Sequence, residues 1–101
     1  MEFQTISIRE FEEYRKRPDT WVIDLRSVEE FEEMHVEGAR NIPYAQLEMY
    51  KKYLPKDKTY ILYCDRGASS LKAARELSRE GYRTVTVVGG IQAILQNIQN
   101  D

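Results

Sequence analysis

The only cysteine of the chain, Cys64, stands where a predicted strand gives way to a predicted helix. Residues 60–63 before it form a compact apolar and aromatic run that is typical of a buried strand. After it, apolar residues recur at helical spacing until Gly81, which is expected to end the helix; they are Leu71, Ala74 and Leu77. A thiol in this position can act as a nucleophile, because the N–H groups at a helix N-terminus favour its reactive thiolate form.

Six residues separate the cysteine from the helical pattern: Asp65, Arg66, Gly67, Ala68, Ser69 and Ser70. If they curl into a loop, the backbone N–H groups of residues 66–70 converge and form a cradle for an anion, with the thiol at its floor. Arg66 would add a positive charge that stabilises the thiolate, whereas Asp65 would oppose it. The alternative is an inert thiol, since free cysteines often serve as small apolar core residues.

The whole chain has the properties of one small domain, residues 1–101. Its apolar content of 42% and charged content of 32% are those of a soluble protein. A single cysteine forms no internal disulfide and fits a reducing compartment, for which the cytoplasm is the default. With no apolar run of membrane-spanning length and no basic stripe with interleaved aromatic residues, neither a membrane nor a nucleic acid is an expected partner.

Charge is unevenly distributed along the chain. Residues 1–40 carry 6 basic and 11 acidic side chains, and residues 41–101 carry 9 and 6. The half that holds the cysteine is therefore the more positive one, which weakly favours a small anionic substrate.

Two other residues could take part in chemistry. Asp24 ends a predicted buried strand, where a carboxylate needs a loop amide or a cation such as Arg26; we expect it to support the structure. His35 is the only histidine and is expected to be a structural hydrogen-bonding residue and not a catalytic base. One histidine and one cysteine do not assemble a metal site, so no metal is expected.

Two short patterns predict helix starts. Ser7 is followed three residues later by Glu10, and Ser27 by Glu30. In such a capping box, each side chain satisfies a backbone N–H group of the other residue. Helices are therefore expected from about residue 8 to 16 and after residue 27. Their inward-facing side chains should be Ile8, Phe11, Val28 and Phe31.

Strand and helix patterns alternate along the rest of the chain. Strands are predicted at residues 3–6, 21–25, 40–43, 60–63 and 84–88. Further helices are predicted at residues 44–54, with Leu47, Met49 or Tyr50, and Leu54 on the inner side, and after the Gly89-Gly90 pair, with Ile91, Ile94, Leu95 and Ile98. The fold class is therefore α/β, with a mainly parallel sheet of about five strands and helices on both faces. Ligands of such sheets bind beyond the carboxyl ends of the strands, where Asp24, Cys64 and Gly89 all lie.

Two groups of residues together resemble the single-domain rhodanese-like sulfurtransferases. The first comprises Asp24-Leu25-Arg26, Glu30-Phe31 and the segment from His35 to Pro43, HVEGARNIP. The second comprises Cys64-Asp65-Arg66-Gly67, Ser70, Ala73-Ala74, Gly81-Tyr82 and Val88-Gly89-Gly90-Ile91. The order and spacing of these pieces span nearly the whole chain and are specific in combination.

The resemblance implies that Cys64 takes up a sulfane sulfur as a persulfide and passes it to a thiol or to cyanide, without a metal or an organic cofactor. The donor would be a small anion such as thiosulfate, or a protein or low-molecular-weight persulfide. The loop residues 65–70 would bind it, and Asp24 and Arg26 would support the site. The chain departs from the family pattern at Ser69, which stands where the loop commonly carries an arginine, and at Met34 and Ile94.

Two other functions are compatible with parts of this pattern. Cysteine phosphatases also hold an oxyanion in a loop between strand and helix, but they place an arginine six residues after the cysteine and usually a histidine before it. This chain has Ser70 and Tyr63 there. The second alternative is a non-catalytic rhodanese-like binding or regulatory module. The presence of Cys64 argues against that alternative, and the replacement of the loop arginine by Ser69 argues for it.

Overall fold

A computed structural model describes residues 3–65 and 67–99, with the side chains of residues 97–99 excepted. Its centre is a five-stranded sheet in the order β1-β5-β4-β2-β3, in which every neighbouring pair is parallel. The strands are β1 (Gln4–Ile6), β2 (Thr20–Asp24), β3 (Arg40–Asn41), β4 (Thr59–Tyr63) and β5 (Arg83–Val87). The predicted parallel α/β sheet is thereby confirmed.

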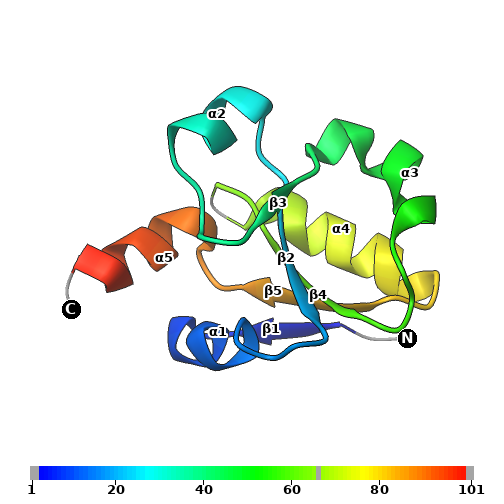
Figure 1. The fold of residues 1–101 in the computed structure, drawn as a ribbon, viewed down its shortest axis with the longest axis horizontal. Coiled ribbons are helices and arrows are strands. Elements are labelled where there is room, and N and C mark those ends of the chain that lie inside the picture. The colour runs from blue at the N-terminus through cyan, green and yellow to red at the C-terminus, as the bar shows by residue number, and fades with distance from the viewer. Residues whose placement is uncertain (1–2, 66, 100–101) are drawn as a thin grey trace.

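Helices cover both faces of the sheet (Figure 1). One face packs against α3 (Leu47–Tyr50) and α4 (Ala68–Arg79), and the other packs against α1 (Ile8–Tyr14) and α5 (Gly90–Gln99). The remaining helix, α2 (Val28–Glu33), follows β2. Short 3-10 turns, Tyr44–Gln46 and Lys51–Tyr53, flank α3. None of the described helices is long and apolar enough to cross a membrane.

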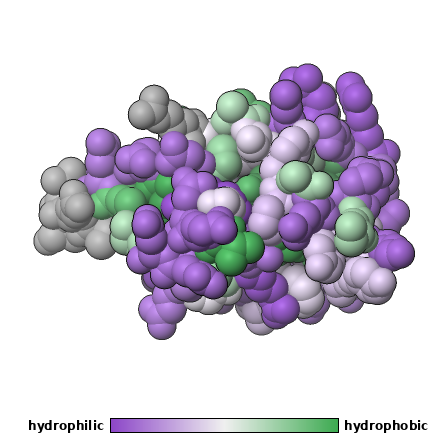
Figure 2. Space-filling model, turned by 90° about the horizontal axis from the view of Figure 1, so that it is seen from above, coloured by the Kyte–Doolittle hydropathy of each residue, from purple (hydrophilic) through white to green (hydrophobic). Residues whose placement is uncertain are grey.

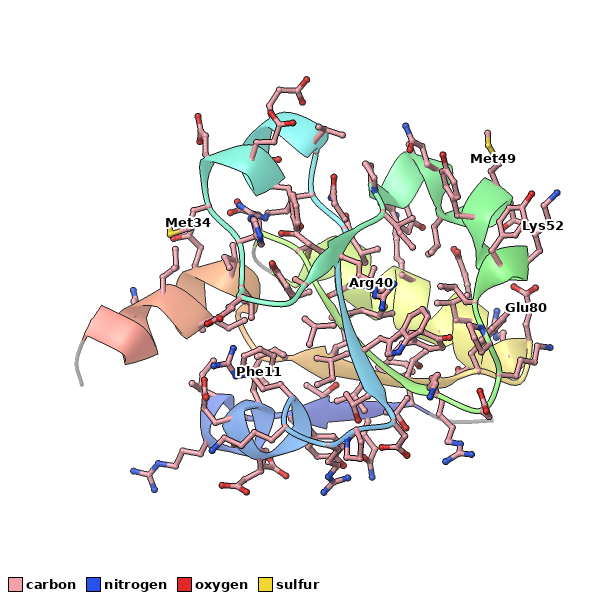
Figure 3. The ribbon with its side chains drawn as sticks, viewed as in Figure 1. Phe11, Met34, Arg40, Met49, Lys52 and Glu80 are labelled. Carbon is pink, nitrogen blue, oxygen red and sulfur yellow. The ribbon has the colours of Figure 1, made fainter. Side chains whose placement is uncertain are left out.

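The core has two halves because side chains of β4 alternate between the faces of the sheet. Tyr60 and Leu62 belong to the half that α3 and α4 cover, and Ile61 and Tyr63 belong to the half that α1 and α5 cover. All four are 0% exposed. Phe11 of α1, also fully buried, lies between its helix and the sheet (Figure 3). The strand that leads to the cysteine is therefore the most deeply buried part of the fold.

Both predicted capping boxes are present. The Ser7 hydroxyl accepts the Glu10 N–H group at 3.2 Å, and the Glu10 carboxylate accepts the Ser7 N–H group at 3.0 Å. Ser27 and Glu30 make the same pair of contacts at 3.2 and 3.3 Å. These local patterns fix the N-terminal ends of α1 and α2 as predicted.

The predictions that Val28 and either Met49 or Tyr50 face inward are wrong. Val28 is 45% exposed, because the six-residue α2 buries none of its side chains. Leu71, which belongs to the predicted helical pattern, is 43% exposed, because it lies outside the face of α4 that is buried through Ser70, Ala73, Ala74, Leu77 and Ser78. Met49 is 64% exposed and points outward (Figure 3).

The predicted continuous helix over residues 44–54 is also wrong. The segment is broken into α3 and its two 3-10 turns, so its inward positions no longer follow one helical period. Leu47 and Leu54 are buried as predicted, whereas Tyr50 is 44% exposed. The surface seen over α2 and α3 is mostly hydrophilic, with apolar areas that are small and separate (Figure 2).

Candidate active site

The candidate site lies at the carboxyl ends of the central strands. Asp24 at the end of β2 is in register with Tyr63 at the end of β4, and Cys64 follows directly. The chain then turns into α4, while the Gly89-Gly90 pair follows β5 next to it. The predicted convergence of Asp24, Cys64 and the glycine pair at one edge of the sheet is thereby confirmed.

The Cys64 sulfur is held by the loop that follows it. Cys64 is 6% exposed, and its Sγ accepts the Gly67 N–H group at 3.0 Å. The Ser70 hydroxyl lies 3.7 Å from the same sulfur and donates to the Gly67 carbonyl at 3.0 Å. Gly67 adopts φ +110°, a left-handed conformation that disfavours other residues. A glycine at this position therefore lets the chain turn so that an N–H group faces the sulfur.

The first turn of α4 adds further donors beside the thiol. The first hydrogen bond within the helix joins the Leu71 N–H group to the Gly67 carbonyl at 3.1 Å. The N–H groups of residues 68–70 therefore precede the regular helical pattern, as at any helix N-terminus. Ser70 is buried, Ser69 is half-buried and Ala68 is exposed. Of the predicted cradle, the Gly67 N–H contact with the sulfur is present; the predicted role of Arg66 concerns a residue outside the described ranges.

The N-terminus of α5 holds the start of the cysteine loop. The Ile91 N–H group donates to the Cys64 carbonyl at 2.9 Å, and the Gln92 N–H group donates to the Asp65 carbonyl at 3.4 Å. The Gln92 side-chain amide also donates to the Asp65 carboxylate at 3.0 Å. A β-carbon at Gly90 would lie 2.6 Å from the Cys64 carbonyl oxygen, so only glycine permits this approach. The sequence analysis did not identify Gln92, and the Gly-Gly pair was its only signal of a close contact here.

Asp24 and Arg26 form a buried ion pair at the end of β2, next to Tyr63 of β4. Asp24 is 0% exposed and accepts the Arg26 backbone N–H group at 2.8 Å and the Arg26 Nη2 at 2.8 Å. Arg26 also donates to the Met34 carbonyl. Asp24 was expected to have a loop amide or a cation as its partner, and it has one of each, both from Arg26.

The Tyr63 hydroxyl contacts both this ion pair and the backbone at Val36. Its hydroxyl accepts the Val36 N–H group at 3.1 Å. Burial raises the pKa of Tyr63 above its ordinary value, and a hydrogen bond with Asp24 adds to this effect, so the phenol stays protonated. The sequence analysis identified Tyr63 only as a strand residue, because nothing local marks its hydroxyl as a contact of a segment 27 residues away.

His35 has structural contacts. Its Nδ1 is hydrogen-bonded to the Phe31 carbonyl at 2.7 Å, and its ring stacks on the Phe31 ring at a centroid distance of 3.7 Å. These contacts agree with the interpretation of His35 as a structural residue. Among residues 3–65 and 67–99, no group of three or more histidine, cysteine or acidic side chains is placed to hold a metal ion.

Comparison with known proteins identifies the family of this chain. A sequence model described as the rhodanese-like domain matches residues 7–97. The chain belongs to the rhodanese-like family. This confirms the resemblance drawn from the Asp24 and Cys64 motifs.

Individual relatives support the same assignment. Thiosulfate sulfurtransferase GlpE of Coxiella burnetii is 31% identical over 93 residues, which are 91% of this chain and 87% of that protein. A tRNA sulfurtransferase of Shewanella piezotolerans is 42% identical over 73 residues, which are 68% of this chain but 15% of that protein. A crystal structure of a rhodanese-related protein from Thermoplasma volcanium superposes with a TM-score of 0.87 at 30% identity and covers 94% of this chain and 93% of that one.

Proposed function

We propose that this protein is a sulfurtransferase that carries a sulfane sulfur as a persulfide on Cys64. The observation that carries the proposal is the 3.0 Å contact between the Gly67 N–H group and the Cys64 sulfur, in a loop that opens into a helix N-terminus. An N–H group aimed at sulfur stabilises its anionic form, which is the nucleophile. The sulfurtransferase names of two relatives favour the same reaction class.

The reaction has two steps. The Cys64 thiolate attacks the outer sulfur of thiosulfate, a new S–S bond forms on Sγ, and the S–S bond of thiosulfate breaks with its electron pair leaving on sulfite. An acceptor thiolate, or cyanide, then attacks the outer sulfur of the persulfide. The bond between that sulfur and Sγ breaks, and its electron pair returns to Sγ as a thiolate. The Gly67 N–H group stabilises the anion on Sγ at the start and the end of the cycle.

The loop residues 65–70 form the proposed donor site. Gly67 supplies the observed N–H contact, and the first turn of α4 supplies those of Ala68, Ser69 and Ser70. A dianion such as thiosulfate suits a helix N-terminus. Asp65 and Arg66 belong to the same proposed site, and Arg66 lies outside the described residues. Asp24 and Arg26 are proposed to support it through their ion pair, which lies beside the end of β4.

The cytoplasm is the proposed location. A sulfur carrier with one cysteine needs that cysteine as a free thiol, and Cys64 is free here. Reducing compartments keep thiols in this form.

A persulfide borne by another protein or by a small molecule is an alternative sulfur donor under the same mechanism.

The test is sulfur loading and transfer by the intact protein. Incubation with thiosulfate should add the mass of one sulfur atom to the protein, and cyanide should remove it as thiocyanate. Cys64→Ser should abolish both reactions and retain the unfolding midpoint of the parent within a small margin, since one buried atom changes. Ser78→Ala, at a buried serine at the far end of α4, is the matched control and should keep both reactions. A parent protein that takes up no sulfur would favour the non-catalytic binding module instead.

A further inference from the structure

A cavity of about 380 Å³ opens beside the cysteine loop. Its wall on the loop side comes from Gly67, Ala68 and Leu71. The opposite wall comes from the ends of β1 and β5, with Thr5, Thr86 and Val88 among its residues. A volume of this size is within the range of small-molecule sites.

The described lining of this cavity carries no charged side chain. Its two hydroxyl groups, on Thr5 and Thr86, are hydrogen-bonded to each other at 3.1 Å. Leu71 and Val88 line the cavity and are 43% and 59% exposed, although both are large apolar residues. The two hydroxyl groups of the cavity are thus satisfied and its apolar side chains are not covered, so it suits an uncharged aliphatic group.

Gly67 contacts the sulfur and also lines this cavity. Its N–H group binds the Cys64 Sγ at 3.0 Å, and the same residue lines the cavity. On the side of its missing β-carbon, Gly67 faces the Gly89 backbone, whose nitrogen would lie 3.9 Å from that carbon. One residue of the cavity wall therefore contacts the nucleophile directly.

We propose that this cavity binds the aliphatic body of the thiol that accepts sulfur from Cys64. The inference rests on the proposed sulfurtransferase function and names the class of its second substrate. The donor and the acceptor then meet at Gly67 and Ala68 and otherwise use different groups: the N–H groups of the loop suit an anionic donor, and the uncharged side chains of the cavity suit an apolar acceptor. The acceptor thiolate attacks the outer sulfur of the persulfide, the new S–S bond forms on the acceptor, and the bond to Sγ breaks to leave a thiolate on Cys64.

The first test uses the persulfide-loaded protein and a series of acceptors with the same thiol group. From ethanethiol to hexanethiol, kcat/KM should rise about fourfold for each added methylene group, the factor that corresponds to burying one methylene. 2-Mercaptoethanesulfonate, whose body is charged, should fall below ethanethiol. Leu71→Gln should flatten the dependence on chain length and leave sulfur loading from thiosulfate unchanged. Met49→Gln is the matched control, since Met49 is exposed on α3 away from the cavity, and it should keep the full dependence (Figure 3).

A second measurement needs no sulfur chemistry. Hexanol should shift the methyl NMR signals of Leu71 and Val88, and butanol should do so more weakly. If the protein loads sulfur but shows neither these shifts nor a dependence on chain length, the cavity is not the acceptor site. An equal dependence in the Leu71→Gln and Met49→Gln variants would overturn the proposal as well. If hexanol binds but no sulfur is loaded, the proposed function fails, and the acceptor role fails with it.

Discussion

Replacing Gly90 by alanine tests how α5 holds the cysteine loop. A β-carbon at Gly90 would lie 2.6 Å from the Cys64 carbonyl oxygen and 2.8 Å from the Asp65 carbonyl oxygen, closer than atoms of these types approach. Both carbonyls are backbone atoms, so relief requires the loop and the helix to move apart. That movement would break the 2.9 Å hydrogen bond from the Ile91 N–H group to the Cys64 carbonyl.

Gly38→Ala provides the matched control. Gly38 has φ +84° and nothing within 4 Å of the added β-carbon, whereas Gly90 has φ +62° and the two close oxygens. Both substitutions carry the left-handed penalty of about 1–2 kcal/mol. Only Gly90→Ala also loses the hydrogen bond at Cys64, worth about 0.5–1.5 kcal/mol, and adds the overlap. We therefore expect Gly90→Ala to lower the free energy of unfolding by about 1–3 kcal/mol more than Gly38→Ala does, from a total of roughly 5–15 kcal/mol.

Two assays test this prediction. Urea unfolding gives the difference in free energy between the two variants. The rate of alkylation by iodoacetamide reports the thiol directly, because Cys64 is the only cysteine. The displaced loop should weaken the contact between the Gly67 N–H group and Sγ, so native-state alkylation should change in Gly90→Ala and stay at the parent value in Gly38→Ala. Equal stabilities and equal alkylation rates in the two variants would refute the argument.

Three further substitutions test other contacts. Asp24→Asn leaves Arg26 with an unpaired charge in a buried site and should lower the free energy of unfolding, measured in urea, by about 3–5 kcal/mol. Glu12→Gln, at the more exposed pair with Arg15, should lower it by ~0–1 kcal/mol. Similar losses in the two variants would contradict this prediction. Burial raises the pKa of Tyr60 to about 12, while an unfolded tyrosine titrates near ~10. The free energy of unfolding should therefore fall as the pH rises from about 10 to 12, and Tyr60→Phe should reduce that fall. An unchanged pH profile in the variant would show that Tyr60 is not the source of the fall. Ser69→Arg should lower KM for thiosulfate about tenfold and leave neutral persulfide donors unaffected, because a guanidinium grips an oxyanion through charge-assisted hydrogen bonds; an unchanged KM would show that position 69 does not meet the donor.

The sequence alone determined the strands, most of the helices and the position of the thiol, but not the broken helix over residues 44–54. Apolar runs placed the strands to within one or two residues, and the Ser7 and Ser27 capping boxes predicted two helix starts. A capping box depends on contacts between residues three apart, and a buried strand on a short continuous apolar run, so a linear pattern contains both. The parallel sheet followed from the alternation of strands and helices, and it placed Asp24 and Cys64 at one edge.

Tertiary structure alone decided which side chains face the core and what holds the thiol. Leu71 fits a helical pattern, yet it lines a cavity, because it lies outside the face of α4 that packs on the sheet. The Cys64 carbonyl meets the Ile91 N–H group, and the Asp65 carboxylate meets Gln92, across 27 residues of chain. Such contacts arise only when β4 and β5 lie side by side and deliver the loop and α5 to the same edge of the sheet. The sequence thus located the nucleophile, and long-range packing set the donors around it and the cavity beside it.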